Sequence, residues 1–316
     1  MTLLGQLANS DFLTISRSPD FDHFRGIERL GEAHSIPLDC RGFASAFAAM
    51  PLKSCSIYLQ RTFPRILQAR YSTTGAMVGF AMNDEGSVTL NGVEARAPSI
   101  LLVKGNAVCE IVEPQANLIA FVNFTSIDDR GWPGEFDRAQ FVATKPARFE
   151  ALQGVIRQVL LLASNAPGVF LQFGMQESVE ESIVQAVDQA MQATPPPSDD
   201  KRPNLTNYLS LVRKFDEFLA ANAGRPLYSA DMAKQLGVSV RTLHNAVVAI
   251  RGMSMHRYTR LRRLWNVHRQ LVQGCQVESI KAIALVNGFW HMGEFISAYR
   301  ELFGETPQQS LATARH

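Results

Sequence analysis

The chain has 316 residues, a length typical of two domains. Hydrophobic residues make up 46% of it and charged residues 19%, which is the composition of a globular protein. No stretch is apolar enough to cross a membrane, and the N-terminal sequence MTLLGQLANSDFLTISRSPD lacks the basic start and long apolar core of a signal peptide. We therefore expect a cytoplasmic protein with no membrane partner.

The charge is unevenly distributed along the chain. The formal net charge is only +2, but residues 1–200 hold 15 Lys and Arg against 22 Asp and Glu. Residues 201–316 hold 16 basic against 7 acidic residues, which gives that part a charge of +9. A basic part joined to an acidic one indicates that only the second part meets a polyanion.

Short runs of β-branched and aromatic residues dominate roughly residues 50–125, and they predict strands. Asn91-Gly92 stands between two such runs and is typical of a two-residue hairpin. The number and spacing of the runs favour an antiparallel barrel or sandwich. Two helices follow, over 147–163 and 175–193, because apolar residues recur there every three or four positions. The second has a polar face and packs on the barrel or on a second subunit.

A proline-rich segment, TPPPSDDKRP, runs from Thr194 to Pro203. Three consecutive prolines prevent a helix, and the charged flank favours solvent. We therefore predict an α+β protein of two domains: a β-barrel with its own C-terminal helices over 1–194, a linker over 195–203, and an all-helical domain over 204–316.

The helical domain begins with a pattern typical of a helix-turn-helix unit. In SADMAKQLGVSVRTLHNAVVAI, we expect Ser229 to cap a short helix and Gly237 to form the turn. Ser239 then caps a second helix, whose Leu243 faces inward.

A second unit of the same kind follows in SIKAIALVNGFWHMGEFISAYRELFG, with Ser279 as the cap and Asn287-Gly288-Phe289 as the turn. Between the two units, SMHRYTRLRRLWNVHRQLV predicts a long basic helix that fixes their separation. We interpret the aromatic residues of the second unit as core, including Trp290, and we interpret His268 of the long helix as a core histidine.

Two such units joined by a basic helix and ending in FGETP resemble the AraC/XylS family of bacterial transcription regulators. The resemblance covers residues 205–312: GVSVRTL resembles the first turn of the family, NGFWHMGEF the second turn, and YRELFGETPQQSL the terminal signature. The N-terminal part resembles the family's cupin-like sensing and dimerisation domain in its layout and strand density.

The resemblance implies that the second helix of each unit enters the major groove, on successive turns of one face of duplex DNA about 34 Å apart. Arginine reads guanine and asparagine reads adenine in that groove. Carried onto this chain, the reading residues are Arg241, His244 and Asn245 in the first unit, with Ser239 and Thr242 near the phosphates, and His291, Met292, Glu294 and Ser297 in the second. Glu294 stands where related sequences often have a basic residue; it either accepts from cytosine or repels the backbone.

The long basic helix offers Arg257, Arg260 and Arg263, which either contact phosphates or form a solvated face. The resemblance also implies a small-molecule effector, a homodimer formed through the N-terminal domain, an operator duplex as partner and RNA polymerase as a further partner.

One basic group in the N-terminal part suits a nucleotide. Arg61 and Arg65, followed by Arg70 and Ser72, are similar to the R-x-x-x-R and S-x-x-G motifs of PilZ-type cyclic di-GMP receptors. Arg70 stands where that family has Asp or Asn, and Arg25 and Arg29 show the same spacing. We prefer surface arginines at a strand edge and keep cyclic di-GMP as an alternative effector.

Metal and enzyme chemistry are not expected. The histidines of residues 1–200 are His23 and His34 alone, and no H-x-H motif is present. We therefore expect no metal, no cofactor and no catalytic residue. Cys40, Cys55, Cys109 and Cys275 lie far apart, which favours buried thiols. A DNA-repair alkyltransferase-regulator with a cysteine-rich domain is a second alternative that this spacing opposes, and a purely structural DNA binder is a third.

Overall fold

A computed structural model describes residues 2–19, 21, 32–71, 74–83, 86–95, 98–126, 130–192, 204–222, 228–273 and 279–313. The chain divides into two compact units: unit 1 is Met1–Ile36 with Phe43–Asp199, and unit 2 is Pro37–Gly42 with Asp200–His316. The sequence-based division places Pro37–Gly42 in the first domain, and the predicted linker lies outside the described residues. Across the described ranges, no helix is long and apolar enough to span a bilayer.

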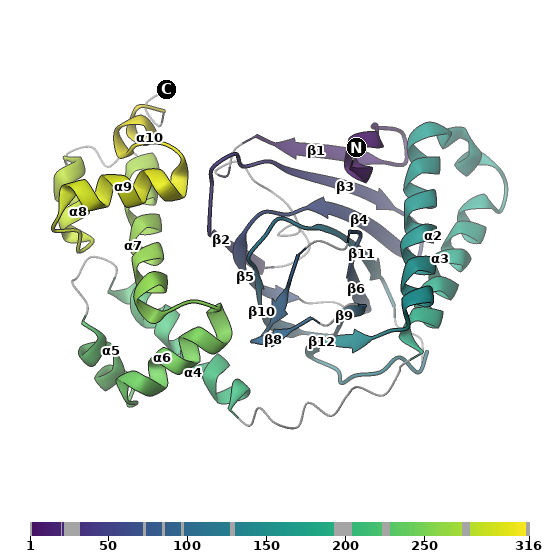
Figure 1. The fold of residues 1–316 in the computed structure, drawn as a ribbon. Coiled ribbons are helices and arrows are strands. Elements are labelled where there is room, and N and C mark those ends of the chain that lie inside the picture. The colour runs from purple at the N-terminus through teal and green to yellow at the C-terminus, as the bar shows by residue number, and fades with distance from the viewer. Residues whose placement is uncertain are drawn as a thin grey trace. The chain divides into compact units, whose positions relative to one another are not determined.

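Unit 1 contains two antiparallel sheets, as predicted (Figure 1). In the part of the chain that is described, the seven-stranded sheet has the order β1 (Thr14–Ser18), β3 (Ser45–Pro51), β4 (Cys55–Arg61), β11 (Leu118–Phe124), β6 (Ala76–Ala81), β9 (Ser99–Lys104) and β12 (Arg138–Ala143). The five-stranded sheet has the order β2 (Glu32–Pro37), β5 (Arg65–Tyr71), β10 (Ala107–Glu113), β7 (Thr89–Leu90) and β8 (Val93–Glu94). The predicted hairpin joins β7 to β8, with a φ of 52° at Asn91 and 81° at Gly92.

The strands alternate between two cores. Side chains such as Leu67, Ile111 and Phe121 from both sheets meet inside the barrel. The other face of the seven-stranded sheet, with Ile57 and Val122, packs against two helices. These are α2 (Pro146–Asn165) and α3 (Met175–Met191), which lie side by side against the sheet in Figure 1, near the short elements α1 (Leu3–Gln6) and η2 (Pro167–Leu171).

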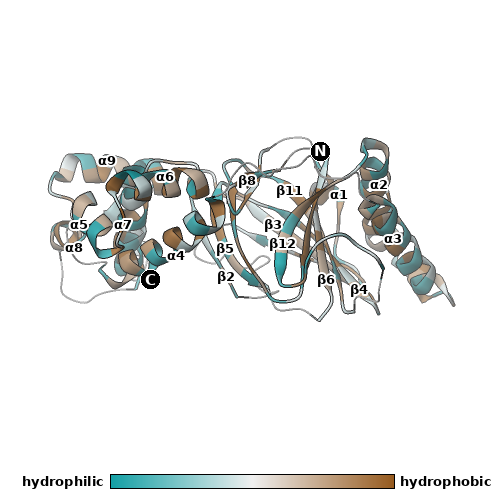
Figure 2. Cartoon of the chain, turned by 90° about the horizontal axis from the view of Figure 1, so that it is seen from below, coloured by the Kyte–Doolittle hydropathy of each residue, from teal (hydrophilic) through white to brown (hydrophobic). Residues whose placement is uncertain are grey.

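Unit 2 is helical, as the apolar spacing predicts. Its described helices are α4 (Leu205–Ala221), α5 (Ser229–Gln235), α6 (Val240–Arg251), α7 (Met255–Val272), α8 (Ile280–Val286), α9 (Met292–Phe303) and α10 (Pro307–Thr313). These helices carry both hydrophilic and hydrophobic residues along their length (Figure 2). Many of the hydrophobic ones, such as Phe215, Leu243 and Phe295, are buried. Helices α5 and α6 form the first predicted helix-turn-helix unit and α8 and α9 the second, with α7 between them.

Candidate nucleic-acid interface

The turn of the first helix-turn-helix unit is fixed by backbone hydrogen bonds. After α5, Gly237 has a φ of 68°, a left-handed conformation that favours glycine. The amide of Val238 then donates to the carbonyl of Ala233 over 3.0 Å. The prediction that Ser229 caps α5 is wrong, because Tyr228 takes the cap position and Ser229 is already the first helical residue.

Helix α6 presents one face to the core and the other to solvent. Leu243, Val247 and Ile250 are buried at 0–1% exposure. The predicted reading residues Arg241, His244 and Asn245 are all exposed on the opposite face. The Oγ of Ser239 accepts from the backbone amide of Thr242 over 3.0 Å, which confirms the predicted cap. The N-terminal end of α6 carries the positive end of the helix dipole.

A buried charged cluster joins the end of α6 to α4 and α7. The Arg251 guanidinium at the end of α6 is 0% exposed and is paired with Asp216 of α4. The hydroxyl of Tyr258, in α7, donates to the other oxygen of Asp216 over 2.5 Å. Burial raises the pKa of Tyr258, so this hydroxyl stays protonated and remains a donor. Three helices are therefore held together by one carboxylate.

The second unit repeats the same turn. Gly288 has a φ of 80°, and the amide of Phe289 donates to the carbonyl of Ala284 over 2.9 Å. The predicted cap is confirmed at Ser279, whose side chain accepts from the amide of Ala282 over 3.2 Å. The turn is one residue longer than in the first unit, because α9 starts four residues after its glycine whereas α6 starts three after Gly237.

Helix α9 buries an aromatic face and exposes a polar one. Phe295 and Tyr299 are 0% exposed, as predicted, whereas the predicted reading residues Glu294 and Ser297 point to solvent. His291 is also exposed, and Met292 is half-buried. The interpretation of Trp290 as a packing residue is wrong, since it is 64% exposed. It occupies the extra length of the turn, ahead of the cap residue His291.

Under α9 lies a second buried cluster, which is linked through an imidazole and two hydroxyl groups. His268 is 6% exposed, and its Nδ1 lies 2.7 Å from the hydroxyl of Tyr299. That hydroxyl lies 2.7 Å from the Oγ of Ser310 in α10, and the His268 ring stacks on Phe303. The interpretation of His268 as a core histidine is therefore confirmed.

The arginines of α7 differ in their exposure. Arg257 and Arg260 are exposed. Arg263 is half-buried against the second turn, where a Cβ on Gly288 would lie 3.2 Å from its guanidinium, and burial lowers the pKa of Arg263. Arg260 and Arg263 line a groove of about 660 Å³ within unit 2, together with Trp290 and Glu294.

Part of unit 2 is similar to domains of known proteins. Residues 232–312 match a family model described as a helix-turn-helix domain. The "Probable thc operon regulatory protein" of Rhodococcus erythropolis is 32% identical over 104 residues, which are 33% of this chain and 31% of that protein. The "XylDLEGF operon transcriptional activator" of Pseudomonas putida is 33% identical over 96 residues, 30% of each chain. Thus the match spans about a third of the length of the curated relatives.

The C-terminal part of the chain is therefore a helix-turn-helix domain of the AraC type. Among solved structures, a probable AraC family transcriptional regulator from Rhodopseudomonas palustris CGA009 is 34% identical, with a TM-score of 0.31, and the similarity covers 34% of this chain and 99% of that one. The residues matched by the family model contain α6, α7 and α9.

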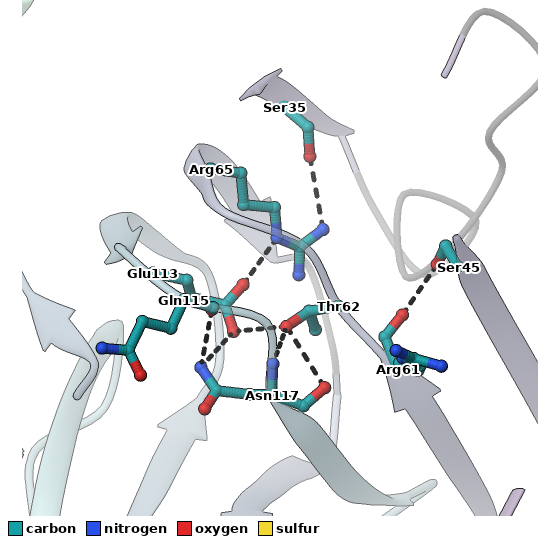
Figure 3. A network of polar contacts seen from close by, with 8 residues as sticks. All are labelled: Ser35, Ser45, Arg61, Thr62, Arg65, Glu113, Gln115 and Asn117. Carbon is teal, nitrogen blue, oxygen red and sulfur yellow. Dashed lines mark hydrogen bonds and ion pairs between the residues drawn. The ribbon is translucent and has the colours of Figure 1, made fainter. Parts of the chain in front are cut away.

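Outside the AraC-type domain, the arginines predicted to bind a nucleotide are dispersed. Arg65 is 1% exposed, and its Nε donates to the Glu113 carboxylate over 2.6 Å. Figure 3 shows Arg61 apart from that pair, beside Ser45, and its side chain is exposed. Arg70 is 66% exposed near Glu32, and Ser72 lies outside the described residues. The interpretation as surface arginines is therefore wrong for Arg65, and no shared groove forms from the described members.

The described cysteines also lie apart. Cys55 is buried between the seven-stranded sheet and the helices, whereas Cys109 is buried inside the barrel. Burial raises the pKa of Cys55 to about 12, so its thiol stays protonated and unreactive near neutral pH. No group of three or more His, Cys, Asp or Glu suited to a metal occurs in the described ranges.

Proposed function

We propose that the protein is a sequence-specific DNA-binding transcription regulator whose output is controlled by a small effector bound to unit 1. The observation that carries this proposal is the exposed row of Arg241, His244 and Asn245 on the second helix of a helix-turn-helix unit within a basic domain. Both relatives bear the names of operon regulators, which supports the same activity.

In this proposal, Arg241 reads a guanine and Asn245 an adenine, while Ser239 and Thr242 contact phosphates at the start of α6. The second reading helix contributes His291, Met292, Glu294 and Ser297. Arg257, Arg260 and Arg263 of α7 neutralise the backbone. Two copies associate through unit 1, and RNA polymerase is the target of regulation, as the family resemblance implies. The separation of Arg61 from Arg65 argues against cyclic di-GMP as the effector.

The test is the salt dependence of duplex binding by the full chain. Neutralising about six to ten phosphates releases counterions, so affinity should fall roughly 10³- to 10⁵-fold between about 50 and 200 mM salt. A gel-shift titration measures this slope. If the duplex is bound with the same affinity at both salt concentrations, or not at all at the lower one, the proposed function is wrong.

A further inference from the structure

The barrel of unit 1 encloses a cavity of about 160 Å³. Most of its wall is aliphatic and aromatic, with contributions from Leu67, Leu101, Ile111, Ile119, Phe121 and Phe141. An apolar cavity of about this volume accepts a single benzene-sized ring, whereas pockets for larger ligands start at roughly 300 Å³. The cavity therefore fits a compact molecule of about one ring.

At one end of the cavity, a buried ion pair closes the wall. Arg65 and Glu113 both line the cavity, are both 1% exposed and are joined over 2.6 Å (Figure 3). The second carboxylate oxygen of Glu113 accepts from Thr62 over 3.1 Å and from Asn117 over 3.3 Å. The pair is thus neutral and the carboxylate is saturated by the protein itself. An anion brought in beside Arg65 would be buried against Glu113, and a cation would have to displace Arg65, so both are unfavourable.

One polar atom at this end of the cavity accepts nothing from the described protein. The Asn117 side-chain nitrogen donates to Glu113 and to the carbonyl of Gln115, which fixes the amide orientation. Its Oδ1 is buried and has no hydrogen-bond partner. Asn117 is 3% exposed, and both it and Gly86 line the cavity. A Cβ on Gly86 would lie 1.9 Å from that oxygen, so a larger residue at position 86 would displace the Asn117 amide. A buried acceptor in this position calls for a donor.

We propose that this cavity binds an uncharged, largely apolar molecule of about one ring that carries a single hydrogen-bond donor directed at Asn117. Its apolar body fills the cavity, and its N–H or O–H group donates to the Asn117 Oδ1, the atom of the amide for which the protein supplies no donor. This inference rests on the proposed role of unit 1 as the effector domain, and it names the chemical class of the effector.

Three probes of the same ring size separate the features of this ligand. Phenol has the donor, toluene lacks it, and benzoate carries a negative charge. Calorimetric titration into the full chain should show phenol binding about threefold to tenfold more tightly than toluene, which is the contribution of one neutral hydrogen bond. Benzoate should bind at least about a hundredfold more weakly than phenol, because its charge meets Glu113. Benzoate binding as tightly as phenol, or no binding of any probe, would overturn the proposal.

Two variants test the location. Ala81 lines the cavity, so Ala81→Phe should fill it and abolish binding of phenol and toluene alike. Val108→Phe is the matched control, because Val108 is 41% exposed on β10 and its variant should bind as the parent does. Asn117→Leu should remove the preference for phenol over toluene while keeping toluene binding. Should Asn117→Leu not fold, the Ala81→Phe and Val108→Phe pair still decides the site, and unchanged probe binding by Ala81→Phe contradicts it.

Duplex binding, measured in the same preparation, distinguishes this inference from the proposed function. A chain that binds DNA but none of the probes retains the proposed function and loses the cavity ligand. A chain that binds phenol in the cavity but no DNA retains the ligand site and loses the regulator.

Discussion

The two helix-turn-helix units share a backbone plan but differ in the surfaces they present. In both, a seven-residue helix is followed two residues later by a glycine of positive φ, and the amide after that glycine donates to an alanine carbonyl five residues earlier. In both, a twelve-residue helix follows. Yet α6 exposes Arg241, His244 and Asn245, whereas the matching positions of α9 hold Gly293, Ile296 and Ser297. A repeated scaffold therefore does not imply a repeated contact with the partner.

The buried clusters that support α6 and α9 differ too. The first rests on the buried ion pair of Arg251 and Asp216, and the second rests on His268, Tyr299 and Ser310. Removing one partner of a buried ion pair leaves a charge without compensation, which costs more than removing one neutral hydrogen bond. We therefore expect the first unit to be the more sensitive to a single substitution in its support.

The largest expected effect is that of Asp216→Ala. It removes the carboxylate that pairs with the buried Arg251 guanidinium, so the free energy of unfolding should fall by about 3–5 kcal/mol. Urea denaturation of the full chain, followed by a probe of helix content, measures this. The matched control is Glu217→Ala, whose side chain is exposed on the same helix and whose removal should change stability by less than about 0.5 kcal/mol. Equal effects of the two variants would show that the Arg251–Asp216 pair does not stabilise the fold.

Tyr299→Phe should destabilise the second unit by a smaller amount. It removes only the hydroxyl between His268 and Ser310, so we expect a loss of about 1–3 kcal/mol in the same denaturation experiment. Tyr228→Phe serves as the control, because Tyr228 is 70% exposed. A loss as large as that of Asp216→Ala would contradict the difference drawn between the two supports.

Arg241→Ala should weaken binding to the preferred duplex by about 1–3 kcal/mol and relax the preference at one base pair, because a bidentate contact to guanine is lost. Arg260→Ala is the comparison variant: as a phosphate contact, it should weaken all duplexes alike and lower the salt slope by about one charge. Gel shifts on preferred and scrambled duplexes separate these outcomes. Equal losses on both duplexes for Arg241→Ala would make it a backbone contact.

Glu294→Gln should have the smallest effect, and its sign decides the role of α9. If the carboxylate repels the phosphates, the neutral variant binds more tightly by about 0.2–1 kcal/mol, and this gain shrinks as salt rises. We expect this result, since α9 exposes no arginine in its first turn to offset the charge. Weaker binding confined to the preferred sequence would instead assign Glu294 to the reading of cytosine.

Local patterns predict much of this molecule. Strands between Ser54 and Phe124 and the helices of both units follow from the spacing of apolar residues. The alanine-rich β3 and the polar β2 are not evident in that way, because their strand form depends on partners supplied by the rest of the sheet.

Among the site residues too, local patterns predict exposure but not contacts between residues far apart in the sequence. Exposure of Arg241, His244 and Asn245 follows from helical periodicity. Burial of Arg65 does not, because its partner Glu113 is 48 residues away and meets it only across the pairing of β5 with β10. Trp290 is exposed because the second turn is one residue longer. The hydrophobicity of a tryptophan predicts burial and gives no information on the length of the turn.

The most direct test is selection of duplexes from a random pool by the full chain and by its Arg241→Ala variant, followed by sequencing. The account predicts an enriched site whose strong half lies about 10 base pairs, one helical turn, from a weaker half. It also predicts that Arg241→Ala loses preference in the strong half only. Enrichment of no sequence, or an unchanged site for the Arg241→Ala variant, would contradict the claim that α6 reads the DNA.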